Sequence, residues 1–300
     1  MLEVLSRDAF NLYVAWEFMD NSVVIRSARY RDARAIFDIH LKSLKGLDEE
    51  DYEWFAGLLK IRSRRRIVLV AEVNGVVAGF IIAYKYRDRA YIDSLAVDPK
   101  YRGMGIGSRL LKALEDLLRT NGVETISLSV KKDNYSALGF YIKHGYIVNG
   151  VVLLLSAHRD NIVSNGLHGY TVIVKKGFTA DLKTKVLPSA WWSSVTEYVD
   201  KKIYRFYGEY TLAVYRGDKL RGIASYQPEK DMTVDYLAVS YHRPTEALSA
   251  LLSALKKEAF SKNIEWITIP VDATKNALTR KLMDHGFRIE SIEYKLVKEF

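Results

Sequence analysis

The sequence predicts an α+β fold that is built twice along one chain. Strand-like and helix-like segments are mixed throughout, and short motifs of the first half return in the second half at nearly constant spacing. The chain has 300 residues, 49% of them hydrophobic, which is enough for two domains of ordinary size.

The repeat rests on three matches in register. "YIDSLAV" contains Asp93 and returns as "VDYLAV" with Asp235, 142 residues later. "HGY" at 144–146 returns as "HGF" at 285–287, and "LVAEVNGVVAG" returns as "LAVYRGDKLRG". These matches predict an extension at 1–22, a first domain at 23–157, a linker at 158–167 and a second domain at 168–300.

The first half of the first domain predicts a strand, two helices, a hairpin and a further strand. The expected ranges are 23–28, 30–44, 48–61, 66–86 and 90–97. The second helix starts with acidic residues, whose negative charge is favourable at the positive, N-terminal end of a helix dipole. Asn74-Gly75 is a typical two-residue hairpin turn.

The second half of this domain predicts a long helix, a strand, a short helix and a closing strand, at 108–120, 125–130, 134–144 and 146–156. The long helix has an apolar stripe at helical spacing, formed by Leu110, Leu111, Leu114, Leu117 and Leu118. Asn121-Gly122 marks the expected C-terminal end of this helix.

A glycine-rich loop, "RGMGIG" at 102–107, joins a strand to the long helix. It lacks the lysine and hydroxyl residue of a phosphate-binding P-loop, and Ser108 stands where a dinucleotide fingerprint needs its third glycine. The remaining pattern, Arg-x-x-Gly-x-Gly before a helix, favours a cradle for a pyrophosphate.

Together with "SLAV", "NYSALGFY" and "HGY", this loop resembles the GCN5-related N-acetyltransferase (GNAT) family over about residues 23–156. The resemblance implies tandem GNAT-like acyl-CoA N-acyltransferase folds and acetyl-CoA as the acetyl donor, without a metal. It assigns cofactor binding to Leu95, Ala96, Val97, Arg102, Gly103, Met104, Gly105, Ile106, Gly107, Ser108, Asn134 and Tyr141. The first domain is most similar to the N-terminal-amine and ribosomal-protein branch, although that branch's paired tyrosines on the closing strand are absent.

The implied reaction is attack of a neutral amine on the thioester. Tyr141 is the expected acid for the departing thiolate, since a phenol stays protonated at neutral pH. Many family members carry a glutamate where this chain has Tyr91. Tyr91 could position a water, Asp93 is the nearby alternative base, and a structural role for Asp93 is equally open.

The second domain lacks the cradle. The 142-residue shift places Pro244, Ala247 and Ser249 at the positions of Arg102, Gly105 and Gly107, and Leu282 replaces Tyr141. We therefore expect a degenerate GNAT-like domain that binds no acetyl-CoA.

The amino-acid composition limits the kinds of chemistry and of binding partner that we expect. The chain has no cysteine, which excludes disulfides and thiol nucleophiles, and a formal net charge of +9, which favours phosphate-bearing partners. We expect a cytoplasmic enzyme whose acceptor is a small amine, a protein N-terminus or a lysine, with no membrane or nucleic-acid partner and with a homodimer left open. The alternatives are an acetyl-CoA-sensing regulator without turnover and a nucleic-acid-directed acetyltransferase.

Overall fold

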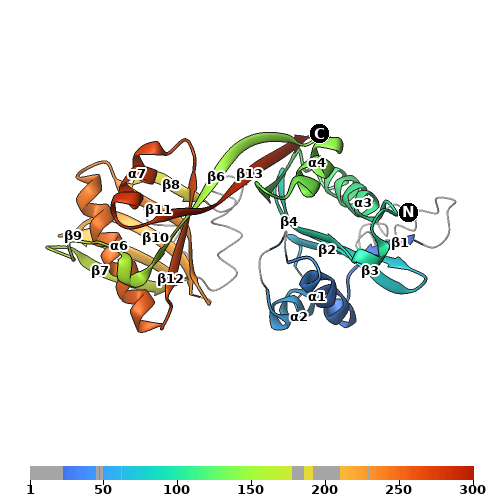
Figure 1. Cartoon of the computed structure of the whole chain (residues 1–300), viewed down its shortest axis with the longest axis horizontal. Coiled ribbons are helices and arrows are strands. Elements are labelled where there is room, and N and C mark those ends of the chain that lie inside the picture. The colour runs from blue at the N-terminus through green and yellow to red at the C-terminus, as the bar shows by residue number, and fades with distance from the viewer. Residues whose placement is uncertain are drawn as a thin grey trace, which may run out of the picture. The chain divides into compact units, whose positions relative to one another are not determined.

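The computed structural model describes residues 23–44, 47, 50–61, 63–177, 186–191, 210–228 and 230–300, with only the backbone for 186–191 (Figure 1). The predicted extension at 1–22 lies outside the described residues. The chain forms two compact units, which we call the first unit (Met1–Ile126 with Lys298–Phe300) and the second unit (Ser127–Val297).

Five strands form the sheet of the first unit, in the same order as in the sequence. They are β1 (Val23–Ser27), β2 (Arg66–Val73), β3 (Val76–Tyr86), β4 (Arg89–Val97) and the beginning of β5 (Thr125–Lys131). Two short helices, α1 (Ala33–Leu41) and α2 (Tyr52–Lys60), cover one face, and α3 (Ile106–Thr120) covers the other (Figure 1). Because both faces are covered, the central strand β3 is buried along most of its length.

The local signals of the sequence explain these elements. Asn74 and Gly75 adopt positive φ of 50° and 79° in the β2–β3 turn. The Asp51 carboxylate caps α2 by accepting from the Trp54 N–H at 2.7 Å. The leucine stripe of α3 faces the core, with four of the five predicted leucines buried and Leu117 half-buried.

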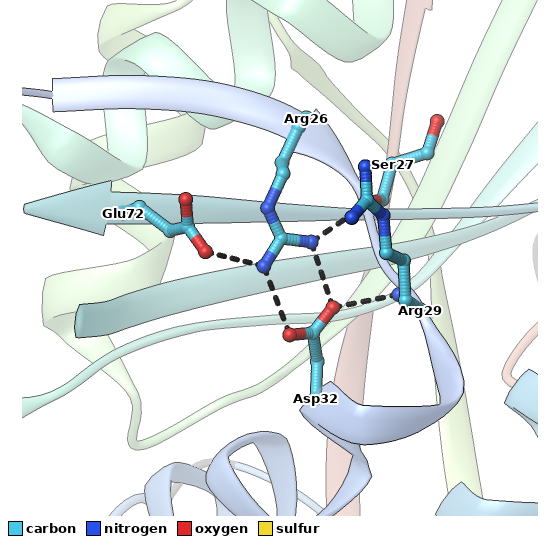
Figure 2. A network of polar contacts seen from close by, with 5 residues as sticks. All are labelled: Arg26, Ser27, Arg29, Asp32 and Glu72. Carbon is cyan, nitrogen blue, oxygen red and sulfur yellow. Dashed lines mark hydrogen bonds and ion pairs between the residues drawn. The ribbon is translucent and has the colours of Figure 1, made fainter. Parts of the chain in front are cut away.

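A buried arginine ties β1 to its neighbours (Figure 2). The Arg26 guanidinium donates to both carboxylate oxygens of Asp32, at 2.7 and 2.9 Å, and also to the Glu72 carboxylate. Asp32 lies in a short 3₁₀ turn (Tyr30–Asp32) just before α1, and Glu72 lies on β2. The network therefore fixes the start of α1 against the edge of the sheet.

The second unit contains the rest of β5 and seven further strands in the order β5-β13-β6-β12-β11-β10-β9-β7. These strands are β6 (Ile147–His158), β7 (Thr171–Lys176), β9 (Tyr210–Arg216), β10 (Lys219–Pro228), β11 (Met232–Ser240), β12 (Trp266–Asp272) and β13 (Arg288–Glu299). Its helices are α4 (Tyr135–Lys143), α6 (Pro244–Ser261) and α7 (Asn276–Asp284). One more strand, β8 (Val186–Trp191), pairs with β11.

The duplication is visible in matching irregularities. The β3–β4 register passes from the Ile82–Ser94 pair to the Ala83–Ile92 pair, so Asp93 is an extra, bulged residue. The β10–β11 register also shifts, at the segment that holds Asp235. The two aspartates that the sequence aligns thus lie at equivalent bulges.

The closing strands do not follow the sequence expectation. Segment 146–156 was expected to close the sheet of its own repeat, but β6 lies between β12 and β13. The last strand of the chain, β13, in turn lies between β5 and β6. The border between the compact units accordingly falls within β5, and the predicted domain boundaries stay a prediction about the repeats.

Candidate functional site

The chain leaves β4 through a tightly held turn. A short 3₁₀ helix (Pro99–Tyr101) follows Val97, and the Asp98 carboxylate caps it by accepting from the Lys100 N–H at 3.0 Å. Lys42, at the end of α1, donates to the same carboxylate at 2.7 Å, and this hydrogen bond holds the pKa of Asp98 below its usual range. No local sequence pattern indicates this contact, because it joins residues 56 positions apart.

Two glycines shape the loop that follows. Gly103 and Gly105 have φ of +82° and +73°, in the left-handed region that glycine favours. A Cβ built at either residue would meet nothing within 4 Å. The conformation therefore requires glycine, and the space beside the loop is open to a ligand.

The loop ends at the N-terminus of α3, where Gly105 is the N-cap. The first N–H groups of a helix have no partner inside the helix, and the helix dipole makes this end positive. Arg102 to Gly105 are exposed, whereas Ile106 is buried and fixes the first turn against the core. Backbone N–H groups beside open space fit the oxygens of a pyrophosphate.

Arg102 has a different setting from the one expected. Its Nε donates to the Val97 carbonyl at 3.0 Å, and its Nη2 lies 3.4 Å from the Ser43 hydroxyl. The side chain thus joins the end of β4 to the segment after α1. The groups of the loop that remain available to an anion are therefore its backbone N–H groups.

The cofactor-binding segment predicted on β4 has one edge occupied by β3. Leu95, Ala96 and Val97 are opposite Ile81, Phe80 and Gly79. Ala96 is buried, while Leu95 and Val97 are half-buried. This strand leads directly into the glycine loop, as the sequence predicts.

The two candidate bases differ in exposure. Tyr91 is 8% exposed, whereas Asp93 is exposed at the bulge. In the second repeat the equivalent Asp235 is only 5% exposed and accepts from the Gln227 amide at 3.1 Å. The carboxylate is therefore structural in the second repeat and open to water in the first.

Asn134 and Tyr141 belong to the second unit. Asn134 caps α4, because its Oδ1 accepts from the Ala137 N–H at 3.1 Å. Tyr141 is 7% exposed, and burial raises the pKa of its phenol above the usual value of about 10. It packs edge-on against Phe140 and Tyr146. A buried phenol of this kind keeps its proton at neutral pH.

The second repeat has no glycine loop. Helix α6 already begins at Pro244, the position equivalent to Arg102, so a helical turn replaces the loop. Ala247, Ser249 and Leu282 are buried, and the Ser249 hydroxyl accepts from the Asn165 N–H at 3.0 Å. The start of α6 also carries its own carboxylate, Glu246.

That carboxylate is already paired. Glu246 accepts from Arg216 at 2.9 Å and from Arg243 at 3.3 Å. The first turn of α6 thus holds a carboxylate that occupies two arginines, whereas the first turn of α3 has no acidic residue.

In the second repeat, strand β8 pairs with the strand edge that a cofactor arm would need. Leu237, Ala238 and Val239 of β11 are equivalent to the three residues that end β4, and β10 occupies one of their edges. The other edge pairs with β8, in register Leu237 with Ala190 and Val239 with Leu187. Sequence reasoning missed β8, because a six-residue apolar run containing proline is a weak strand signal.

Two other kinds of feature are absent from the described residues. Among the described residues, no group of three or more His, Asp or Glu side chains is arranged to hold a metal ion. Nor does the described part of the chain include a helix with the length and hydropathy of a membrane span.

Comparisons with known proteins identify the family of the chain. A family model described as "Acetyltransferase (GNAT) family" matches residues 33–146. An "Acetyltransferase" of Yersinia pestis (strain Pestoides F) is 32% identical over 95 residues, which cover 32% of this chain and 67% of the relative. The Bacillus subtilis (strain 168) "Putative [ribosomal protein bS18]-alanine N-acetyltransferase" is 27% identical over 133 residues, covering 44% of this chain and 86% of the relative.

Solved structures extend the similarity to both repeats. A "Tandem GNAT protein from the clavulanic acid biosynthesis pathway" has a TM-score of 0.71 at 14% identity, covering 92% of this chain and 98% of its own. A GCN5-related N-acetyltransferase from Sphaerobacter thermophilus has a TM-score of 0.67 at 15% identity, covering 94% and 97%. These likenesses show the tandem fold, and the sequence relatives show the family. The chain therefore belongs to the acetyltransferase (GNAT) family and is an N-acetyltransferase of tandem GNAT fold.

Proposed function

We propose that the chain transfers the acetyl group of acetyl-CoA to a primary amine, and that only the first repeat carries the site. The observation that carries this proposal is the loop at Gly103 and Gly105, whose left-handed glycines face open space at the N-terminus of α3. The second repeat has a helical turn at the same place.

Each part of acetyl-CoA has a matching group in this proposal. Backbone N–H groups of the loop and of the first turn of α3, Arg102 to Ser108, hold the pyrophosphate. The pantetheine arm pairs with Leu95, Ala96 and Val97 on the edge of β4 away from β3. Asn134 offers its amide to the arm, since its Oδ1 already serves as the cap of α4.

The acetyl transfer needs one bond to form and one to break. The neutral amine nitrogen attacks the thioester carbonyl carbon, and a backbone N–H of the Leu95–Val97 segment stabilises the resulting oxyanion. The C–S bond then breaks, and Tyr141 protonates the departing thiolate. Burial keeps the Tyr141 phenol protonated before the sulfur carries charge, so the proton is present when the thiolate leaves.

The amine also has to lose a proton. Of the two candidates, Asp93 is an exposed carboxylate, whereas Tyr91 is a buried phenol and a poor base. We assign Asp93 as the final proton acceptor, through water, and Tyr91 to the positioning of that water. Tyr141, which gave its proton to the thiolate, is protonated again from solvent.

The acceptor we propose is the N-terminal amine of a protein. The support is the name of the Bacillus subtilis relative, which gives the alanine of a ribosomal protein as its acceptor. A cytoplasmic location would be consistent with such an acceptor and stays a prediction.

The test is a panel of short peptides and small amines incubated with acetyl-CoA, with both free thiol and acetylated product measured. We expect stoichiometric coenzyme A and acetyl-peptide from the native chain, and neither from Gly105→Glu. If the native chain binds acetyl-CoA but releases no coenzyme A with any amine, it is a sensor, and the proposed transfer is wrong.

A further inference from the structure

The turn between β4 and the glycine loop is organised around one residue, Asp98, which is 7% exposed. Its backbone N–H donates to the Ala78 carbonyl of β3 at 2.8 Å, and its carbonyl accepts from the Tyr101 N–H at 2.9 Å. Its carboxylate accepts from the Lys100 N–H at 3.0 Å through Oδ1 and from the Lys42 ammonium at 2.7 Å through Oδ2. Asp98 therefore fixes the direction in which the chain leaves β4.

The glycine loop depends on the groups that hold its two ends. Residues 102–105 are exposed, and the glycines at 103 and 105 have no side chain that could pack against the core. After the loop, Ile106 is 1% exposed and fixes the first turn of α3. Before the loop, the turn around Asp98 has the same task. The positions of the loop N–H groups follow from these two fixed ends.

The segment that follows α1 holds the turn from outside. Lys42 and Ser43 are consecutive residues, and each reaches a different part of the turn. Lys42 binds the Asp98 carboxylate, and the Ser43 hydroxyl lies 3.4 Å from Nη2 of Arg102. The Ser43 N–H donates to the His40 carbonyl at 2.8 Å, so this segment is itself attached to the last turn of α1.

Folding stability alone is a weak reason for the contact between Lys42 and Asp98. The Lys42 side chain is 47% exposed, and an ion pair with a half-exposed partner contributes little to the free energy of folding. The Arg34–Asp38 pair on the same helix is more exposed still, with both partners within α1. What distinguishes the Lys42 pair is its place directly before the loop.

We propose that Lys42 is a positioning residue of the acetyl-CoA site. By holding Asp98, it keeps the backbone N–H groups of the glycine loop in the arrangement that binds the pyrophosphate. This inference rests on the proposed function and adds a residue that acts through another, without contact to the ligand. A loop whose donors are already in place loses less conformational freedom when the ligand binds, and the affinity is higher for that reason.

The experiment compares two acetyl donors, acetyl-CoA and acetyl-pantetheine, with an amine that the native chain acetylates. The two donors have the same thioester, but acetyl-pantetheine has no pyrophosphate. Lys42→Met removes the ammonium group and keeps an unbranched side chain. We expect kcat/KM for acetyl-CoA to fall about tenfold, through a higher KM at unchanged kcat, and kcat/KM for acetyl-pantetheine to stay as it is.

Three further variants accompany this change. Lys42→Arg should restore the native value, because a guanidinium can donate to the same carboxylate. Lys42→Gln keeps a neutral donor, should give an intermediate loss, and takes the place of Lys42→Met if that variant does not fold. Arg34→Gln is the matched control, since it removes a cation from the same helix, and it should leave both donors unaffected.

An unchanged kcat/KM for acetyl-CoA in a folded Lys42→Met would overturn the proposal. An equal loss with both donors would also overturn it, because the ion pair would then be a general structural contact. The same loss in Arg34→Gln would reduce the effect to one of net charge. A native chain that transfers acetyl from neither donor to any amine would instead count against the proposed function itself.

Discussion

At the scale of single residues, the proposed acetyl transfer depends most on Tyr141, the proton donor to the departing thiolate. Burial raises the pKa of its phenol above about 10, so the side chain is a proton donor throughout the neutral and mildly alkaline range. Tyr141→Phe keeps the ring and its packing but removes the proton. We expect kcat to fall by roughly 10²–10⁴-fold with little change in the affinity for acetyl-CoA.

Tyr135→Phe is the control for this change, because Tyr135 is on the same helix but 74% exposed. It should keep full activity. In the native chain, kcat should not decline between about pH 8 and pH 10 through loss of the Tyr141 proton, since the shift is upward. A Tyr141→Phe enzyme with an unchanged single-turnover rate would make Tyr141 a packing residue.

The residues of the glycine loop could be predicted because their constraint is local. A left-handed φ at a strand-to-helix junction requires glycine, and the sequence displays it at Gly103 and Gly105. The exposure of Asp93 could not be predicted, because it depends on a bulge that exists only once β3 and β4 pair. The same holds for Arg102, whose partners are set by the segment after α1.

At the scale of secondary-structure elements, the network around Arg26 fixes β1, β2 and the start of α1. Burial alone would raise the pKa of Asp32, but the hydrogen bonds from Arg26 and from the Arg29 N–H outweigh it and hold this pKa below its usual range. Stability from a depressed carboxyl pKa is present above the unfolded value of about 3.9. It is lost as the pH falls through the folded value.

Asp32→Asn should therefore destabilise the first unit at pH 7 by about 3 kcal/mol, because it leaves the buried Arg26 with one fewer carboxylate. The difference from the native chain should shrink as the pH falls below about 4. Asp38→Asn makes the same chemical change in the exposed Arg34–Asp38 pair and should cost less than about 1 kcal/mol. Urea unfolding at pH 7, 5 and 3 measures both. Equal effects of the two variants would show that the network contributes no more than a surface pair.

Most helices and strands could be predicted, but not all strand partners. The apolar run at 146–156 predicts a strand, which is β6 in the structure. The run does not say which strands β6 pairs with, and β6 and β13 each lie beside strands of the other repeat. Such pairing depends on the competition of several apolar strands for the same edges, which no local pattern reports.

At the scale of the whole molecule, the chain keeps two copies of one fold and, in our proposal, one copy of the site. The second repeat retains its buried core, including the apolar face of α6. A helical turn stands in place of the glycine loop, and β8 pairs with the edge of β11 that would otherwise be free. A fold survives such changes because its stability comes from packing, whereas cofactor binding needs open backbone.

Acetyl-CoA should bind once per chain, at the glycine loop of the first repeat. Native mass spectrometry with saturating acetyl-CoA counts the bound ligands on the native chain, Gly105→Glu and Gly122→Glu. Gly122 is the matched control, because it also has a left-handed φ, of +74°, and open space at its Cβ, but it follows the other end of α3. We predict one ligand on the native chain, one on Gly122→Glu and none on a folded Gly105→Glu. Two ligands on the native chain, or one that persists in Gly105→Glu, would contradict the account.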